Sequence, residues 1–146
     1  MFSKFPQDSN EVLGWKWEDY QRYIDDLLAI ALTPDNVDAW LDGWSLLLAA
    51  VSDVYSRRYV AHTVNTADEA AEQAYETFIE EIYPKALEAD QRLKDKLLES
   101  GLSPDNFEVP MRNLRAEADL FRHENVELLA REQKLGSEYD KIISAQ

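Results

Sequence analysis

The chain has 146 residues, and its 45% hydrophobic and 30% charged composition is typical of one globular domain spanning residues 1–146. Its 29 acidic residues outnumber its 15 Lys and Arg residues, and the resulting net charge of −14 disfavours nucleic acids and anionic membranes as partners. Because cysteine is absent, disulfides, thiol nucleophiles and cysteine-ligated metals are excluded.

The N-terminal ten residues are polar and lack the basic and apolar regions of a secretory signal. Apolar runs elsewhere, such as residues 46–51, are far shorter than the ~20 residues that cross a bilayer. We therefore expect a cytoplasmic protein that binds neither membranes nor nucleic acid.

Helical periodicity predicts an all-α fold, beginning with a helix over residues 17–32. Thr33 and Pro34 then favour the start of a second helix that reaches about His62. Trp40 and Trp44 lie on its apolar face, so we expect them in the core rather than as a platform on which a ligand stacks.

A third helix is predicted over residues 66–100, where Thr66 and Glu69 have the spacing of a capping box and Gly101 provides a terminator. Pro84 predicts a kink near residues 80–83. The stretch 66–90 carries eight carboxylates against one lysine. We interpret it as a solvated face; the alternative is a docking face for a basic partner.

The last helix is predicted from about Pro110 to the chain end, and it carries the clearest apolar pattern. Ten positions alternate in steps of three and four, and eight of them are apolar, as in a coiled-coil seam. These positions are Met111, Leu114, Ala118, Phe121, Asn125, Leu128, Glu132, Leu135, Tyr139 and Ile142. Asn125 and Glu132 interrupt the seam, either to fix its register or to face a cavity. Together the segments predict an antiparallel bundle of about four helices with a long, coiled-coil-like C-terminal helix.

The sequence contains no complete catalytic or metal-binding motif among those we compared. The sequence from His123 to Glu127 resembles the zinc motif H-E-x-x-H, but Glu127 replaces the second imidazole. Tyr59 and Leu120 stand where a di-iron bundle requires glutamate three residues before histidine. Neither a nucleophile elbow nor a glycine-rich phosphate loop occurs. We therefore assign no catalytic and no metal-binding residues, and the sequence leaves the substrate-binding residues unknown.

The C-terminal third nevertheless contains two ordered blocks. The first consists of Phe121, Arg122, Glu124 and Asn125, and the second of Leu135 followed by residues 138–142, which read Glu-Tyr-Asp-Lys-Ile. With Tyr83-Pro84 and the run 99–102 upstream, these blocks closely resemble the N-terminal helical region of the oligoendopeptidase F family, zinc metallopeptidases related to thimet oligopeptidase. The resemblance covers most of the chain and is strongest from Pro84 onward.

The resemblance implies a non-catalytic helical wall that covers or gates the channel through which short peptides reach zinc. Family members place H-E-x-x-H in a C-terminal catalytic region that this sequence lacks, so the resemblance implies that zinc and peptidase activity belong to a missing, downstream catalytic domain. We expect an excised domain or truncated product that is inactive alone and self-associates as a homo-oligomer when isolated. The alternative is a stand-alone acidic helical-bundle adaptor that assembles through its 111–142 seam.

Overall fold

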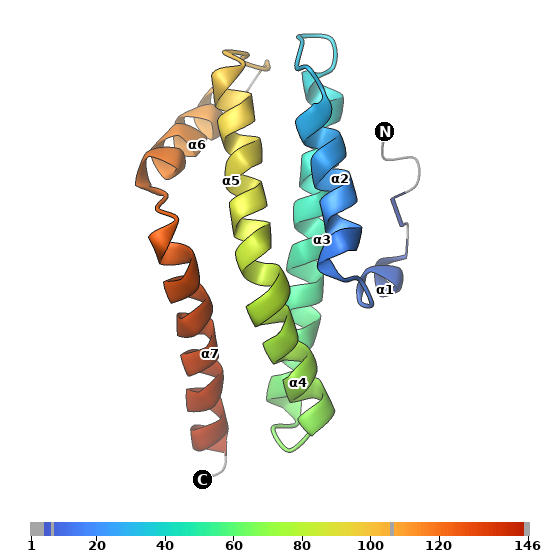
Figure 1. Ribbon diagram of the computed structural model, residues 1–146, viewed down its shortest axis with the longest axis vertical. Helices are drawn as coiled ribbons and strands as arrows, with labels where there is room; N and C mark the ends of the chain where they lie inside the picture. Colours follow the sequence, from blue (N-terminus) through green and yellow to red (C-terminus); the bar gives the residue numbers. More distant parts are fainter. Residues whose placement is uncertain (1–4, 7, 106, 145–146) are drawn as a thin grey trace.

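The computed structural model describes residues 5–6, 8–105 and 107–144, and these residues form an all-α fold without strands (Figure 1). The elements are α1 (Ser9–Val12), α2 (Trp17–Ala29), α3 (Val37–Val64), α4 (Glu69–Thr77), the π-helix η1 (Phe78–Ile82), α5 (Tyr83–Glu99), α6 (Glu108–Leu120) and α7 (Glu124–Ser144). None of the helices in the described part of the chain is long and apolar enough to cross a bilayer.

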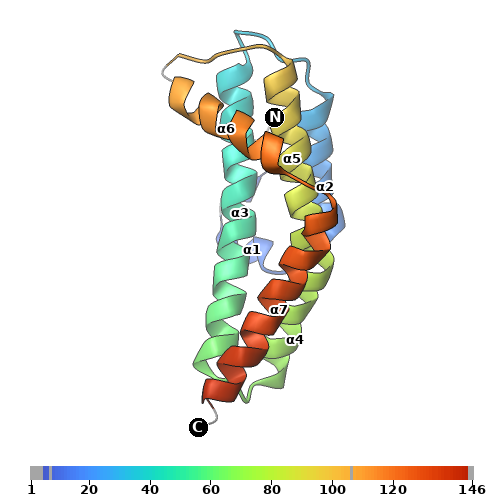
Figure 2. The ribbon, with the colours of Figure 1, turned by 90° about the vertical axis from the view of Figure 1, so that its left-hand side faces the viewer.

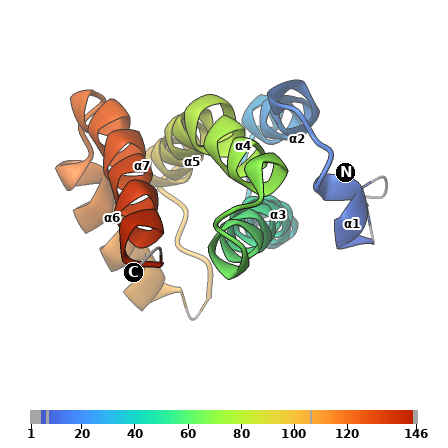
Figure 3. The same ribbon diagram turned by 90° about the horizontal axis from the view of Figure 1, so that it is seen from below.

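The long helices lie side by side and alternate in direction along the chain. α2 and α3 pack together with the continuous rod made by α4, η1 and α5. α6 crosses α3 and α5, and α7 runs back along the same rod, against α5 and η1 (Figures 1 and 2). Seen from below, α7 lies on the opposite side of α4 and α5 from α2 (Figure 3). The predicted all-α class is therefore confirmed.

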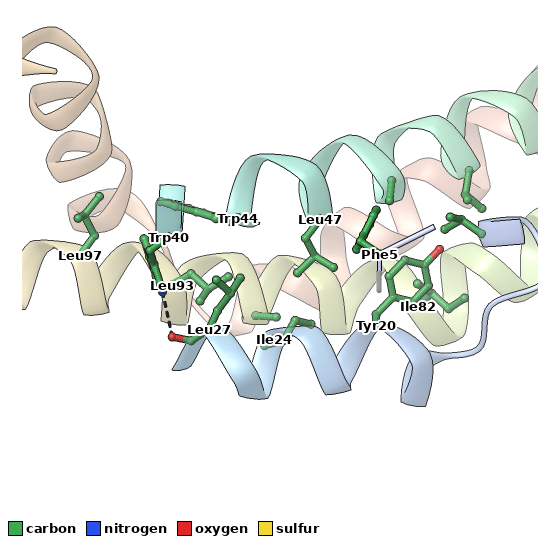
Figure 4. Packing of buried hydrophobic residues seen from close by; sticks show 14 of the residues in the cluster. Phe5, Tyr20, Ile24, Leu27, Trp40, Trp44, Leu47, Ile82, Leu93 and Leu97 are labelled. Carbon is green, nitrogen blue, oxygen red and sulfur yellow. Dashed lines mark hydrogen bonds between the residues drawn. The ribbon is translucent and has the colours of Figure 1, made fainter. Parts of the chain in front are cut away.

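The core lies between α2, α3 and α5 and is rich in aromatic rings (Figure 4). Trp40 is 1% exposed and Trp44 is 6% exposed, which confirms that both are core residues. Tyr20, Leu27 and Leu93 contribute further fully buried side chains. A large apolar area is thus removed from water where the three helices meet, and this burial is the main force that holds them together.

The connection between α2 and α3 differs from the prediction of a helix to residue 32 followed directly by the next. α2 ends at Ala29, and α3 begins only at Val37. The last carbonyls of a helix have no partner within it. Here the Trp40 Nε1–H donates to the Leu27 carbonyl at 2.9 Å, and the Lys96 Nζ donates to the Leu28 carbonyl at 3.0 Å. Groups from α3 and α5 therefore stabilise the end of α2, which a pattern within residues 17–32 could not reveal.

The start of α4 corrects a second expectation. The helix begins at Glu69, and its N-cap is Asp68, whose Oδ1 accepts hydrogen bonds from the Ala70 N–H at 3.0 Å and the Ala71 N–H at 3.1 Å. The predicted Thr66 capping box is therefore wrong. An aspartate carboxylate at this position already satisfies two of the free N–H groups, and it adds negative charge at the positive end of the helix dipole.

Before Pro84, where a kink is predicted, the structure has a π-helical turn over Phe78–Ile82. Proline has no N–H, so the α-helical hydrogen bond to the Glu80 carbonyl is lost. One residue earlier, the Tyr83 N–H bonds to the Phe78 carbonyl five residues back. The rod therefore continues from α4 into α5 with one wider turn rather than ending. It stops at Glu99, and Gly101 adopts φ +68, as the predicted terminator requires.

The predicted single C-terminal helix is wrong, because residues 121–123 separate α6 from α7. α6 crosses α3 and α5, whereas α7 follows α4, and one straight rod cannot take both directions (Figure 2). At the break Phe121 is extended, and the Arg122 Nη1 donates to the carbonyls of Asp119 and Phe121 at 2.9 and 2.6 Å. These bonds satisfy carbonyls that a continuous helix would have used itself.

Candidate functional site

The two histidines lie on different elements and in opposite environments. The His123 side chain is 75% exposed beside the α6–α7 break, with its Nδ1 3.8 Å from the Glu88 Oε1, whereas His62 on α3 is fully buried. Glu124 and Glu127 are both exposed on α7. Within the described ranges no three His, Cys, Asp or Glu side chains are grouped so that they could hold a metal ion. The residues present therefore do not fit a zinc site.

His62 instead forms the centre of the contact between α3, α4 and α7. Its Nε2 is 2.6 Å from the Oγ of Ser137, a buried residue on α7, and its ring stacks on Tyr75 of α4 with an interplanar angle of 3°. A serine beside a histidine is the core of a nucleophilic triad. Here the His62 Nδ1 has no hydrogen-bond partner among the described residues, and solvent does not reach the pair. The contact between His62 and Ser137 therefore joins α3 to α7 inside the fold.

Further polar pairs flank His62 along α7, and we call the whole set the α7 dock. Gln133 accepts a hydrogen bond from the Tyr55 hydroxyl at 2.9 Å, and Asp140 accepts one from the Tyr59 hydroxyl at 3.1 Å. The hydrogen bond to Asp140 raises the pKa of Tyr59, because the carboxylate favours the protonated phenol. No local pattern in the sequence indicates these pairs, since their partners lie 78 and 81 residues apart.

Two lysines of α7 complete the dock against the acidic rod. Lys134 lies 2.7 Å from the Glu80 Oε1, and Lys141 pairs with Glu72. The hydrogen bond from Lys141 lowers the pKa of the Glu72 carboxyl, and the hydrogen bond from Lys134 to Glu80 raises the pKa of that lysine. Part of the acidic stretch therefore pairs with two lysines of α7 in the same chain. Asp68, Glu69, Glu81 and Glu88, by contrast, are exposed as a solvated face would be.

The opposite side of α7 exposes large apolar side chains, and we call it the α7 outer face. Its members are Leu128 (57% exposed), Leu129 (39%), Leu135 (61%), Tyr139 (63%), Ile142 (64%) and Ile143 (49%). The predicted seam is thus split between two environments. Met111 is buried and Leu114 and Ala118 are half-buried, but every seam residue from Asn125 onward is exposed. An apolar surface of this kind on a helix is typical of an interaction site.

Comparison with known families gives the class of domain to which the chain belongs. The chain matches the Peptidase M3 N-terminal domain family over residues 16–108, which run from the residue before α2 to the first residue of α6. The M3 family includes oligopeptidase F and thimet oligopeptidase. No curated protein and no solved structure matches the chain. The match covers well over half of the 146 residues, and the chain therefore belongs to the Peptidase M3 N-terminal domain family.

Proposed function

We propose that this chain is the non-catalytic N-terminal domain of an oligoendopeptidase F-like zinc metallopeptidase, in which it covers or gates the channel that admits short peptides. The observation that carries the proposal is the family match over residues 16–108. The resemblance of residues 109–142 to the oligoendopeptidase F family extends it beyond the matched range.

The α7 outer face supports a downstream catalytic domain as the partner. Its six apolar side chains stay 39–64% exposed, while the opposite side of α7 packs on the fold through hydrogen bonds, ion pairs and the buried Val126. Covering them by another domain removes apolar area from water, at about 25 cal/mol per Å². In this arrangement the antiparallel helices and the coiled-coil-like spacing of α7 form one wall of the peptide channel.

In this proposal the chemistry belongs to the downstream domain. Zinc and the residues that activate water are expected there, since the described side chains of this chain do not fit a metal site. The full-length protein would hydrolyse short peptides in the cytoplasm, and this chain would shape access without touching the bond that is cleaved. Alone it would bind no zinc and cleave no peptide.

A second candidate, from a different class, is a stand-alone acidic helical adaptor. The same α7 outer face favours it, because a partner chain or a second copy would bury the face as well as a catalytic domain does. The fold is the same for both functions, and the difference between them lies in the gene downstream of this sequence.

The first experiment is to sequence the gene beyond the Gln146 codon. An open reading frame that continues for several hundred codons to H-E-x-x-H supports the peptidase domain, and a stop codon at once makes the adaptor the leading function. The pure chain is then assayed for zinc by mass spectrometry and for cleavage of a quenched fluorescent peptide. Stoichiometric zinc or cleavage that copurifies with the chain would overturn the assignment of a non-catalytic domain.

A further inference from the structure

α6 crosses α3 and α5 (Figure 2). A groove separate from the α7 outer face is lined by residues of these three helices. Its volume is about 590 Å³, within the ~300–1,000 Å³ that is usual for ligand sites. Trp44 and Leu48 line it from α3, Phe107 from the residue before α6, and Leu114 from α6 itself. The groove therefore offers an apolar wall large enough for the side chain of a bound peptide.

The charged residues around this apolar wall are mostly acidic. Asp42 of α3, Asp90 of α5 and Glu117 of α6 line the groove together with one cation, Lys94, so the four groups carry a net charge of −2. Lys94 is held 2.9 Å from the Asp90 Oδ2 and 2.8 Å from the Glu117 Oε2. Asp42, which is exposed, makes no ion pair within the described part of the chain. A basic group of a ligand beside the groove is thus attracted to the Asp42 carboxylate, which no cation in the described part of the chain neutralises.

The position of Trp44 is fixed by the same network. Its Nε1–H donates to the Asp90 Oδ1 at 2.9 Å, while the other Asp90 oxygen contacts Lys94. The wall is therefore preformed, and binding need not order it first, which favours affinity for a short peptide.

We propose that this groove binds a peptide segment in which a large apolar side chain is flanked by Arg or Lys. The apolar side chain lies against Leu48, Phe107 and Leu114, and a flanking cation lies near Asp42 and Glu117. Acidic peptides are repelled by the same carboxylates. The inference does not rest on the proposed peptidase function, because it uses only residues of this chain and is tested on this chain alone.

The test uses three dye-labelled, end-blocked pentapeptides and the full chain in low-salt buffer, with binding measured by fluorescence anisotropy. The first peptide is Gly-Arg-Leu-Arg-Gly, the second replaces both arginines by glutamate, and the third replaces leucine by glycine. We expect the first to bind at least tenfold more tightly than either of the others, since each control removes one of the two recognised features. Equal binding of all three would overturn the proposal, as would no binding of the first at millimolar protein.

Two variants with the same charge change distinguish binding in the groove from a general attraction of the peptide to an acidic protein. Asp42→Lys alters the groove, whereas Asp25→Lys alters an exposed position on α2 outside it. We expect Asp42→Lys to weaken binding of Gly-Arg-Leu-Arg-Gly at least tenfold and Asp25→Lys to weaken it less than twofold. The indole N–H signal of Trp44 in NMR spectra should shift on binding, whereas those of Trp15 and Trp17 should not. Equal weakening by both variants, or an unmoved Trp44 signal, would show that the peptide binds elsewhere.

Light scattering tests whether a second copy of the chain occupies the groove instead of a peptide. If Asp42→Lys changes the oligomeric state of the protein without peptide, the groove is an interface between copies, and the peptide proposal is wrong.

Discussion

Replacing Trp40 by Phe tests how the C-terminal end of α2 is stabilised. The indole donates to the Leu27 carbonyl at 2.9 Å, and phenylalanine keeps the aromatic ring but has no N–H. Trp40 is 1% exposed, and Leu27 is fully buried, so water does not replace the lost donor easily. The substitution therefore leaves a buried acceptor unpaired at a helix end.

The expected cost has two contributions. A buried acceptor left without a partner costs about 1–3 kcal/mol. The smaller ring adds about 1 kcal/mol through the cavity it leaves in a close-packed core. We therefore expect Trp40→Phe to lower the free energy of unfolding by about 2–4 kcal/mol, and each kcal/mol lowers the Tm of a domain of this size by about 4 °C.

Trp44→Phe is the matched control on the same helix. Its indole bonds to the Asp90 Oδ1, but Asp90 retains the ion pair with Lys94 and lies at the open groove. The acceptor is thus not left unpaired, and we expect a cost about 1 kcal/mol smaller than for Trp40→Phe. Urea unfolding followed by circular dichroism at 222 nm measures both variants without relying on tryptophan fluorescence. A cost for Trp44→Phe that equals or exceeds that of Trp40→Phe would refute the reasoning about the helix end.

Three further predictions concern a helix start, alkaline stability and association. Since Asp68 is the N-cap, Asp68→Ala should lower the free energy of unfolding by about 1 kcal/mol and Thr66→Ala by less than about 0.5 kcal/mol, both measured by urea unfolding. A larger cost for Thr66→Ala would support the predicted Thr66 capping box instead. Burial raises the pKa of Tyr20 to about 12, so the folded state keeps a proton that the unfolded state loses above about pH 10. The free energy of unfolding should therefore fall as the pH rises from about 10 to about 12. Tyr20→Phe should reduce that fall, which is measured by urea unfolding at each pH. An unchanged fall would show that Tyr20 does not contribute. The isolated chain should self-associate, as measured by light scattering. Leu135→Asp should shift it toward monomer, whereas Leu46→Asp, at an exposed leucine on α3, should not. A stable monomer at high concentration would contradict the predicted self-association.

The prediction from periodicity worked where one helix buries one continuous face. Trp40 and Trp44 are one turn apart and both lie in the core, because spacing near 3.6 residues puts them on the same side whatever the helix packs against. Proline likewise removes a backbone donor in any surroundings, so a disturbance of the helix before Pro84 was predictable, although as a kink and not as the π-helical turn that the structure shows. Such features depend on covalent chemistry and helical geometry, and neighbouring residues contain all the information.

The candidate site was less accessible to sequence analysis because its parts come from distant segments. His62 and Ser137 are 75 residues apart, and neither stands in a recognisable motif. The 111–142 seam was visible, but its spacing is the same whether it faces the core or a missing partner. Which side of α7 is covered depends on its contacts with the other helices, and these include polar pairs with α3 and η1 that no apolar pattern indicates.

The sequence by itself determined the all-α class, the aromatic core face of α3, the distortion before Pro84 and the resemblance to a peptidase N-terminal region. Tertiary structure alone decided that the last helix breaks at residues 121–123 and that α7 turns its apolar face outward. The physical reason is that helical periodicity reports which residues share a face, whereas the direction of that face depends on the packing of whole helices. Hydrogen bonds and ion pairs across long separations help to settle that direction, and here they leave apolar side chains of α7 exposed.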